Sequence, residues 1–131
     1  MNLGTVSYQV SHNCPGDANF SVILRDKKNT KITESSSQND TLSVSNPKLW
    51  WPRGSIKANG SYGYLHSLEF SMVCNKNGNI SIDIYQISIG IRSINWSKTP
   101  SDIPSFTINN EPFYCKGVNK HEDFAVYSIF K

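Results

Sequence analysis

The sequence predicts an all-β fold, an antiparallel β-sandwich, and three observations support this prediction. Large apolar residues alternate with small or polar ones along most of the chain, as they do in half-buried strands. Clusters of turn residues separate these runs. No segment has the apolar spacing of a helix that could connect parallel strands. Strands without such helices are expected to pair antiparallel and to pack as two sheets face to face.

The alternating runs are short, and each has the length of one strand. Val6-Ser-Tyr-Gln-Val10 is typical, because its apolar side chains fall at every second position. In an extended run of this kind, the apolar side chains all point to one face of the sheet. The sequence therefore predicts six strands, at residues 6–10, 20–24, 42–44, 68–72, 80–84 and 87–91.

Turn residues mark the ends of these strands. The dipeptide Asn77-Gly78 stands between two apolar runs and predicts a tight hairpin, because both residues tolerate the positive φ that such a turn requires. Further turns are predicted at residues 15–17, 27–29, 35–40, 54, 59–60 and 100–102.

The last part of the chain follows a different pattern. Pro100 and Pro104 disfavour both a helix and a central strand, so this segment is predicted to be a linker. After it we expect a strand at Phe106–Ile108, a turn at Asn109-Asn110 and a second extended segment at Pro112–Cys115.

Length and composition agree with one small domain and exclude two classes of partner. A chain of 131 residues buries about two thirds of its unfolded surface, which is enough for a single core. Charged residues make up 18% and the formal net charge is +3, which is too weak to predict binding to nucleic acid or to an anionic membrane. No apolar run reaches the roughly 20 residues of a transmembrane helix, and the first residues lack the features of a secretory signal.

Three cysteines, Cys14, Cys74 and Cys115, lie far apart in the sequence. Their separations give neither a compact disulfide framework nor a CxxC pair for a metal ion. One disulfide is the most that they can form within the chain. We expect instead that they are free, buried thiols that act as small apolar residues.

Five Asn-x-Ser/Thr triplets, the acceptor sequence for N-linked glycans, occur in the chain. They begin at Asn19, Asn39, Asn59, Asn79 and Asn95. Roughly two or three are expected by chance in a chain so rich in Asn and Ser. The excess indicates a parent protein made in the secretory pathway, and the alternative is that composition alone produced the triplets.

The run Phe106–Asp123 is the most informative stretch, because it combines a strand, a turn and a cluster of titratable residues. It resembles the segment that leads from a β-sandwich into the first strand of the catalytic (β/α)8 barrel in glycoside hydrolase family 2, and in its β-glucuronidases in particular. Upstream, Asn46–Pro52, Tyr64–Leu68 and Ile89–Arg92 are similar to motifs that the immunoglobulin-like sandwich of this family presents in the same order.

The resemblance implies that this chain holds only part of an enzyme. Hydrolysis of a glycoside with retention requires two carboxyl groups about 5 to 5.5 Å apart. In the family both glutamates lie on later barrel strands, and they have no counterpart here. We therefore assign no catalytic residue, no metal and no cofactor, and we predict that the chain alone is inactive. The expected domains are an immunoglobulin-like sandwich at residues 1–98, a linker at 99–105 and the truncated start of the barrel at 106–131.

His121 and Asp123 are the candidate substrate-binding residues. The resemblance places them at the carboxyl end of the first barrel strand, the rim on which (β/α)8 enzymes build their active sites. It implies that they bind hydroxyl groups of a glucuronide in the intact enzyme. The alternative is that they organise the barrel mouth or lie in solvent. The sequence after them, Phe124–Lys131, departs from the glycine- and charge-containing loop that is usual in the family.

Trp50 and Trp51 stand between Pro47 and Pro52, and two roles are open to them. They could stack on a sugar ring, or they could pack in the sandwich and against a neighbouring domain. The stiff proline-flanked segment favours the packing role. The resemblance places Arg92 at the seam between sandwich and barrel, where a guanidinium could bind backbone carbonyls or a carboxylate.

Two functions of different class are consistent with the sequence. In the first, the chain is the supporting sandwich of a β-glucuronidase-like hydrolase whose intact, homo-oligomeric parent acts on glucuronides in the lysosome or outside the cell. In the alternative, it is an independent module that binds glycans or a protein. The first predicts association through the unpaired apolar strand at residues 106–118, whereas the second predicts a soluble monomer.

Overall fold

The computed structural model describes residues 3–97, 105–114 and 117, and the regular structure in this part of the chain is almost entirely strand. The 3-10 helix η1 (Ile56–Ala58) is a single turn. No helix among these residues is long and apolar enough to cross a bilayer. The strands are β1 (Leu3–Gln9), β2 (Asp17–Arg25), β3 (Lys31–Ser35), β4 (Asn39–Ser45), β5 (His66–Lys76), β6 (Asn79–Ile89), β7 (Ile94–Ser97), β8 (Ser105–Ile108) and β9 (Glu111–Pro112).

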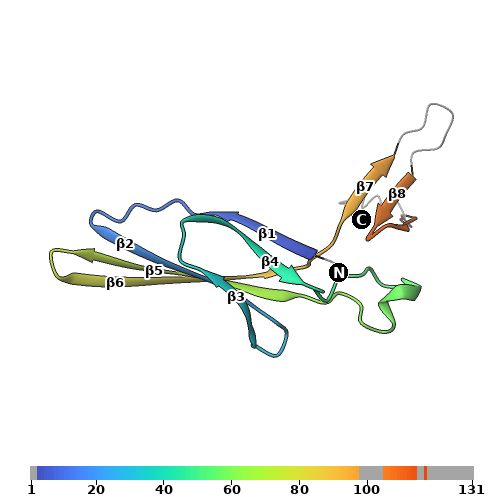
Figure 1. Ribbon diagram of the computed structural model, residues 1–131, viewed down its shortest axis with the longest axis horizontal. Helices are drawn as coiled ribbons and strands as arrows, with labels where there is room; N and C mark the ends of the chain where they lie inside the picture. The colour runs from blue at the N-terminus through green and yellow to red at the C-terminus, as the bar shows by residue number, and fades with distance from the viewer. Residues whose placement is uncertain (1–2, 98–104, 115–116, 118–131) are drawn as a thin grey trace, which may run out of the picture.

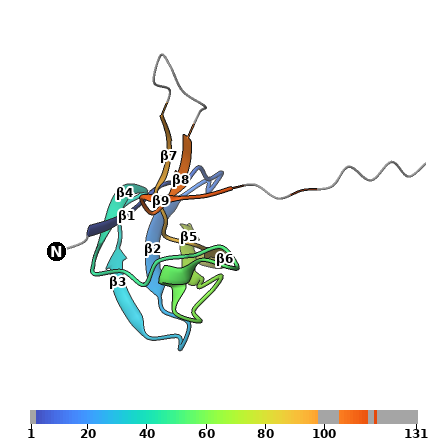
Figure 2. The same cartoon turned by 90° about the vertical axis from the view of Figure 1, so that its right-hand side faces the viewer.

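The strands form three antiparallel sheets. A four-stranded sheet has the order β3-β2-β5-β6, and the pair β1-β4 forms a second layer over it (Figure 1). The third sheet, β7-β8-β9, stands at one end of the two layers, as the end-on view in Figure 2 shows. The predicted antiparallel β-sandwich is thereby confirmed, with most of the expected strands in place, whereas its immunoglobulin-like type and the barrel-entry extension stay predictions.

The core lies between the β1-β4 pair and the four-stranded sheet. Each layer contributes side chains from alternate positions of its strands, so that the two faces interlock. Ile91, just after β6, closes the same cluster. The buried members are Val22, Leu24, Leu42, Val44, Leu68 and Ile91.

Asparagines with positive φ form the turns that the sequence predicts. Asn77 (φ 51°) and Gly78 (φ 86°) join β5 to β6, and the register pairs Lys76 with Asn79 across this hairpin. Asn109 (φ 54°) and Asn110 (φ 63°) join β8 to β9 in the same way. Both hairpins are therefore confirmed at the predicted residues.

Strand β6 corrects one boundary of the prediction. The sequence indicates two strands at residues 80–84 and 87–91, but the structure has one continuous strand. The reason is that its apolar positions change face. Ile80, Ile82 and Ile84 are on the outer face, whereas Ile87 and Ile89 pack against the core. A single strand with such a change has the sequence pattern of two.

The prediction of three free thiols is wrong for two of the cysteines. Cys14 and Cys74 form a disulfide, with 5.7 Å between their Cα atoms. The two cysteines are 60 residues apart in the sequence, so the sequence gives no sign that they are close in space. Their proximity arises because β2 pairs with β5 and places Ala18 opposite Cys74, so the chain just before β2 lies against the same strand. The third cysteine, Cys115, lies outside the described residues.

His66 should make the sandwich less stable in acid. Its side chain is 3% exposed, and its Nδ1 has no hydrogen-bond partner among the described residues. Burial lowers the pKa of this imidazole below 6.5, although the charge of Asp26 opposes the shift. The unfolded chain therefore binds a proton more readily than the folded one, so this contribution to stability is present above about pH 6.5 and is lost as the pH falls.

The measurement is the urea midpoint of the unsubstituted chain and of His66→Phe at several pH values from about 7 to 5. We expect the urea midpoint of the unsubstituted chain to fall more steeply as the pH is lowered than that of the variant, because phenylalanine cannot take up a proton. Equal slopes for the two proteins would contradict this assignment.

Candidate functional site

The predicted substrate-binding residues, His121 and Asp123, lie outside the described residues, as does Glu122. Their role therefore stays a prediction. The described part of the chain brings together a different group of residues, at the end of the sandwich where β6 leads into β7. We call Trp50, Gly90, Arg92 and Asn109 the junction.

The tryptophan segment lies alongside the chain that follows β6. The Trp50 backbone N–H donates to the carbonyl of Ile91 at 2.8 Å. Gly90 is needed here, because a Cβ at this position would lie 2.8 Å from the Cβ and Cγ of Trp50. The indole of Trp50 thus packs on the backbone of the Gly-Ile-Arg segment, which agrees with the packing role expected for it.

Asn109 connects three segments of the chain. Its Oδ1 accepts from the backbone N–H of Ser93 at 3.0 Å, and its Nδ2 donates to the carbonyl of Trp50 at 2.9 Å. Its own backbone N–H donates to the carbonyl of Ser93 at 2.9 Å. The turn between β8 and β9 is therefore fixed to both the tryptophan segment and the start of β7.

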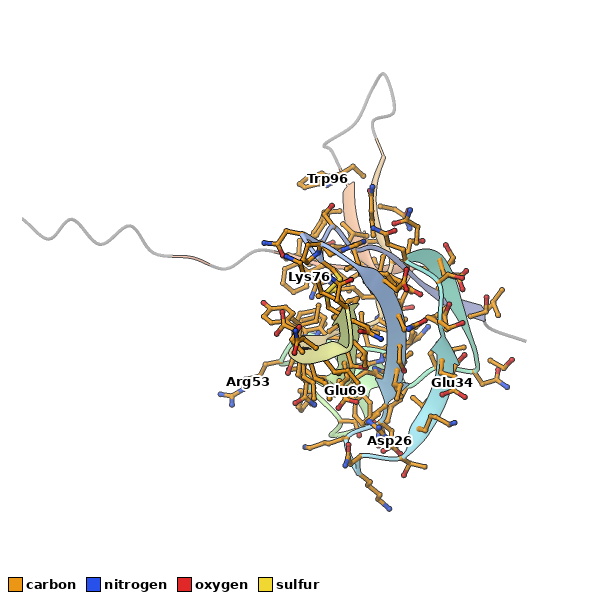
Figure 3. All side chains as sticks on the ribbon, turned by 90° about the vertical axis from the view of Figure 1, so that its left-hand side faces the viewer. Asp26, Glu34, Arg53, Glu69, Lys76 and Trp96 are labelled. Carbon is orange, nitrogen blue, oxygen red and sulfur yellow. A yellow bond between two sulfur atoms is a disulfide. The ribbon has the colours of Figure 1, made fainter. Side chains whose placement is uncertain are left out.

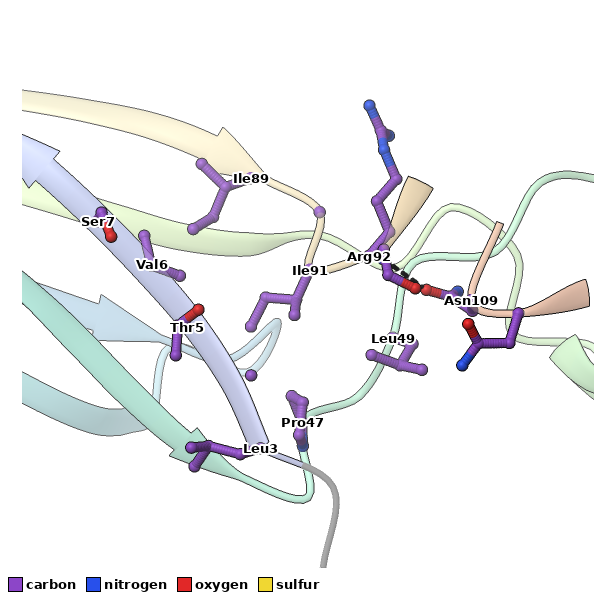
Figure 4. Close-up of a pocket in the computed structure, with 14 residues that line it drawn as sticks. Leu3, Thr5, Val6, Ser7, Pro47, Leu49, Ile89, Ile91, Arg92 and Asn109 are labelled. Atoms are coloured by element: carbon purple, nitrogen blue, oxygen red, sulfur yellow. Dashed lines mark hydrogen bonds between the residues drawn. The ribbon is translucent and has the colours of Figure 1, made fainter. Parts of the chain in front are cut away.

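Arg92 covers the outer side of the tryptophan. Its guanidinium lies 4.5 Å from the centre of the Trp50 ring, in the geometry of a cation–π contact. We expected a guanidinium bound to carbonyls or to a carboxylate at this seam, and the contact that the structure describes is with an aromatic face. In Figure 4 the Arg92 side chain points away from the apolar residues Leu49 and Ile91.

Two hollows flank the junction. The first, of about 640 Å³, lies between β1 and the chain after β6, as the close-up in Figure 4 shows. Its polar side chains are hydroxyls, amides and the guanidinium, and no carboxylate lines it: Thr5, Ser7, Arg92, Ser93, Asn109 and Asn110. The second, of about 480 Å³, contains one carboxylate, Glu111, which pairs with Lys57.

Neither hollow has the groups for hydrolysis of a glycoside. A retaining mechanism needs two carboxyl groups on either side of the glycosidic bond, one as acid and base and one as nucleophile. A single ion-paired glutamate cannot supply both. Charged side chains such as Glu34, Arg53 and Lys76 project from separate parts of the sandwich (Figure 3). No cluster of His, Cys, Asp or Glu in the described residues could hold a metal ion. At the junction, the hydrogen bonds of Asn109 and the packing of Trp50 on Gly90 hold chain segments together.

Carboxyl groups with shifted pKa values also lie away from the junction. The pKa of Asp26 is lowered chiefly because the backbone N–H of Thr30 donates to its carboxylate. The pKa of Asp40 is lowered chiefly by the hydroxyl of Ser35. Both groups stabilise turns between strands, which is a structural role.

Replacing Asn109 with glycine should detach the β8–β9 turn from the sandwich. Glycine accepts the positive φ at this position, so the change isolates the two hydrogen bonds of the side chain. We expect a loss of about 1–3 kcal/mol of unfolding free energy and faster hydrogen exchange at the backbone N–H of Ser93. Asn110→Gly, at the neighbouring turn position, is the control, because it removes the hydrogen bond from Asn95 and leaves those to Ser93 and Trp50 in place. Unchanged exchange at Ser93 in Asn109→Gly would contradict this role.

Sequence reasoning identified Trp50 and Arg92 but missed Asn109 and Lys57. The double asparagine was recognised as a turn, which explains its backbone and not its side-chain contacts. Nothing in the sequence connects residue 109 with residues 50 and 93, because those contacts depend on how three distant segments meet.

Comparisons with known proteins agree with one another. The sequence profile of the family described as glycosyl hydrolases family 2 matches residues 4–92. The β-glucuronidase of Homo sapiens is 32% identical over 120 residues, which cover 92% of this chain and 17% of that protein. The β-glucuronidase of Rattus norvegicus is 31% identical over 122 residues, which cover 93% and 17%.

Solved structures give the same result. The Lactobacillus rhamnosus β-glucuronidase matches with a TM-score of 0.70 and 31% identity, over 94% of this chain and 18% of that one. The Ruminococcus gnavus β-glucuronidase in complex with D-glucuronic acid matches with a TM-score of 0.66 and 27% identity, over 95% and 18%. The chain thus spans about one sixth of the length of the curated relatives that it matches.

Proposed function

Because the chain belongs to glycosyl hydrolases family 2, we propose that it is the supporting immunoglobulin-like sandwich of a β-glucuronidase-like retaining hydrolase. In this role it holds the chain that leads toward the catalytic barrel, and it contributes no catalytic carboxylate. The hydrolysis of the glycosidic bond belongs to the intact parent enzyme.

The junction is the observation that carries this proposal. Asn109 lies near the beginning of the segment that resembles the start of the barrel, and its side chain fixes that segment to the sandwich through Trp50 and Ser93. The cation–π contact of Arg92 adds a further restraint on the same side. An enzyme gains from such a support because small displacements of catalytic groups lower the rate strongly.

The relatives support a proposal for the substrate class. One matched structure is a β-glucuronidase in complex with D-glucuronic acid, so a glucuronide is the proposed substrate of the parent. His121 and Asp123 are the proposed contacts to its hydroxyl groups. The parent is further proposed to be a homo-oligomer that needs no cofactor and binds neither nucleic acid nor membrane.

The proposed compartment is the secretory pathway, with the lysosome or the extracellular space as its destination. Two features support it. Disulfides persist in oxidising compartments, and Cys14 and Cys74 form one. The five Asn-x-Ser/Thr triplets are acceptors that the same pathway uses.

The first test is the activity of the purified chain toward a fluorogenic glucuronide. We expect no turnover above the buffer blank, because the described hollows lack a carboxylate pair. Turnover that disappears in Glu111→Gln would show that the chain is itself a hydrolase. In parallel, the transcript across the codons for His121 to Lys131 should continue into a reading frame with two further glutamates.

A second candidate function, a glycan-binding module, is favoured by one other hollow. This cavity of about 450 Å³ opens on the core face of the sheet beyond the β1-β4 pair, and its size is in the usual range for ligand sites. Aromatic and polar groups line it, as a sugar would require: His12, Phe20, Phe70, Asp83 and Tyr85. The ring of His12 lies 5.1 Å from that of Phe20.

A glycan array with the purified chain tests this second function. Saturable binding that Tyr85→Ala abolishes and Tyr62→Ala retains would favour the module, because Tyr62 is exposed but lies elsewhere. The expectation of an unpaired strand at residues 106–118 is wrong for its first part, because β8 pairs with both β7 and β9, so association of the chain does not separate the two functions.

A further inference from the structure

The outer face of the four-stranded sheet carries an apolar patch. Ile80, Ile82 and Ile84 are 66%, 65% and 64% exposed. They occupy alternate positions of β6 and therefore share one face, which is opposite to the face that packs against the core. Val73 on β5 pairs with Ile82 and extends this surface by one strand. We call these four residues the outer patch.

The outer patch lies mainly on an edge strand, where an exposed apolar surface favours association with other chains. Strand β6 is the edge of its sheet, with β5 as its one partner among the described strands. A long apolar edge strand is a template for association with other chains, and proteins normally cover it or place charges on it. The patch itself contains no charge. A group bound over it would remove this liability.

Asn19 lies on the same face, in line with the patch. The register pairs Asn19 with Val73, and Val73 with Ile82, so the three residues form one row across β2, β5 and β6. Adjacent strands are about 4.8 Å apart, so the row spans about 10 Å from Asn19 to Ile82. Asn19 is exposed and begins the triplet Asn19-Phe20-Ser21.

The other four triplets are placed differently. Asn39 begins β4 in the second layer, and Asn59 follows η1. Asn79 begins β6 but falls at an odd position, so its side chain points to the other face from Ile80. Asn95 is on β7, where its Nδ2 donates to Oδ1 of Asn110 at 3.3 Å. Among the five acceptors, Asn19 alone shares a face with the outer patch.

We propose that Asn19 carries an N-linked oligosaccharide whose first two sugars lie across Val73 and Ile82 and cover the outer patch. Two linked N-acetylglucosamine rings match the length of the row. Their C–H faces and acetamide methyl groups pack on the aliphatic side chains, while their hydroxyls face water. The inference rests on the secretory compartment proposed above, and the disulfide, which joins Cys74 next to Val73, supports that compartment independently of the triplets.

The test begins with occupancy. The full chain is expressed behind a cleavable secretion signal in cultured animal cells, and each of the five triplets is examined by peptide mass spectrometry after enzymatic removal of glycans in isotope-labelled water. Cell lysate and medium are both analysed, so that retained protein is also counted. We expect Asn19 to be occupied in most of the molecules.

The second measurement asks what the glycan covers. Asn19→Gln and Ser21→Ala each remove the acceptor, and Asn39→Gln removes an acceptor in the other layer as a matched control. We expect the first two variants to show a several-fold rise in light scattering and in the fluorescence of an apolar dye, and the control to show neither. Adding Ile82→Thr to Asn19→Gln should reverse both effects.

The outcomes separate this inference from the proposed function. If other triplets are occupied and Asn19 is not, the inference fails and the compartment stands. If no triplet is occupied, the inference fails and the triplets no longer support the compartment, which then depends on the disulfide alone. An occupied Asn19 whose removal changes neither scattering nor dye fluorescence would show that the glycan does not cover the patch. A dimer of the glycosylated chain that Ile82→Thr dissociates would assign the patch to a second copy.

Discussion

Replacing both Cys14 and Cys74 with serine should lower the free energy of unfolding by about 2–4 kcal/mol. The disulfide closes a loop with a sequence separation of 60, and a cross-link of that span removes many conformations from the unfolded chain. It also ties the segment before β2 to the far end of β5. The loss is read from urea denaturation of the two proteins at neutral pH.

Two comparisons make this prediction specific. The unsubstituted chain in the presence of a reductant should unfold at the same urea concentration as the double variant. Cys115→Ser, which removes the third cysteine, should leave the midpoint of the oxidised chain unchanged. A double variant as stable as the oxidised, unsubstituted chain would mean that the disulfide contributes nothing to stability in solution.

Leu24→Ala should destabilise the sandwich by about 2–5 kcal/mol. The Leu24 side chain is 0% exposed and lies in β2, at the centre of the cluster between the two layers. Truncation removes apolar contacts with both layers and leaves a cavity that strands paired on both sides cannot close. Urea denaturation measures this loss.

Leu3→Ala makes the same chemical change at an exposed position and is the matched control. Leu3 is in β1 and is 66% exposed, so we expect its effect to stay within about 0.5 kcal/mol. Comparable losses for the two variants would contradict the location of the core between the layers.

Most of the fold could be predicted because the strands alternate and the turns use Asn and Gly. The hairpins at Asn77-Gly78 and Asn109-Asn110 depend on local backbone conformation alone, which the residue types determine. Strand β3 was missed for a physical reason. Its one large apolar residue, Ile32, is partly exposed, so the strand forms through its pairing with β2 and leaves no alternating pattern.

Long-range contacts were harder to predict. The disulfide joins residues whose proximity exists only after β2 and β5 have paired, so the sequence offered three distant cysteines and no sign of which two would meet. At the junction, too, the local packing was predictable and the long-range contacts were not. Trp50 was expected to pack because of its flanking prolines, but its contacts with Gly90 and Asn109 come from segments that only the folded chain brings together.

The disulfide also has a consequence for the time course of synthesis. A ribosome adds about 5–20 residues per second, so roughly 3–12 s separate the synthesis of Cys14 from that of its partner. Strands β1 to β4 are all synthesised before Cys74, because they precede it in the chain. Covalent closure must wait for β5. In every round of synthesis, Cys14 therefore leaves the ribosome several seconds ahead of its partner, and during that time its thiol is open to exchange enzymes and to other nascent chains.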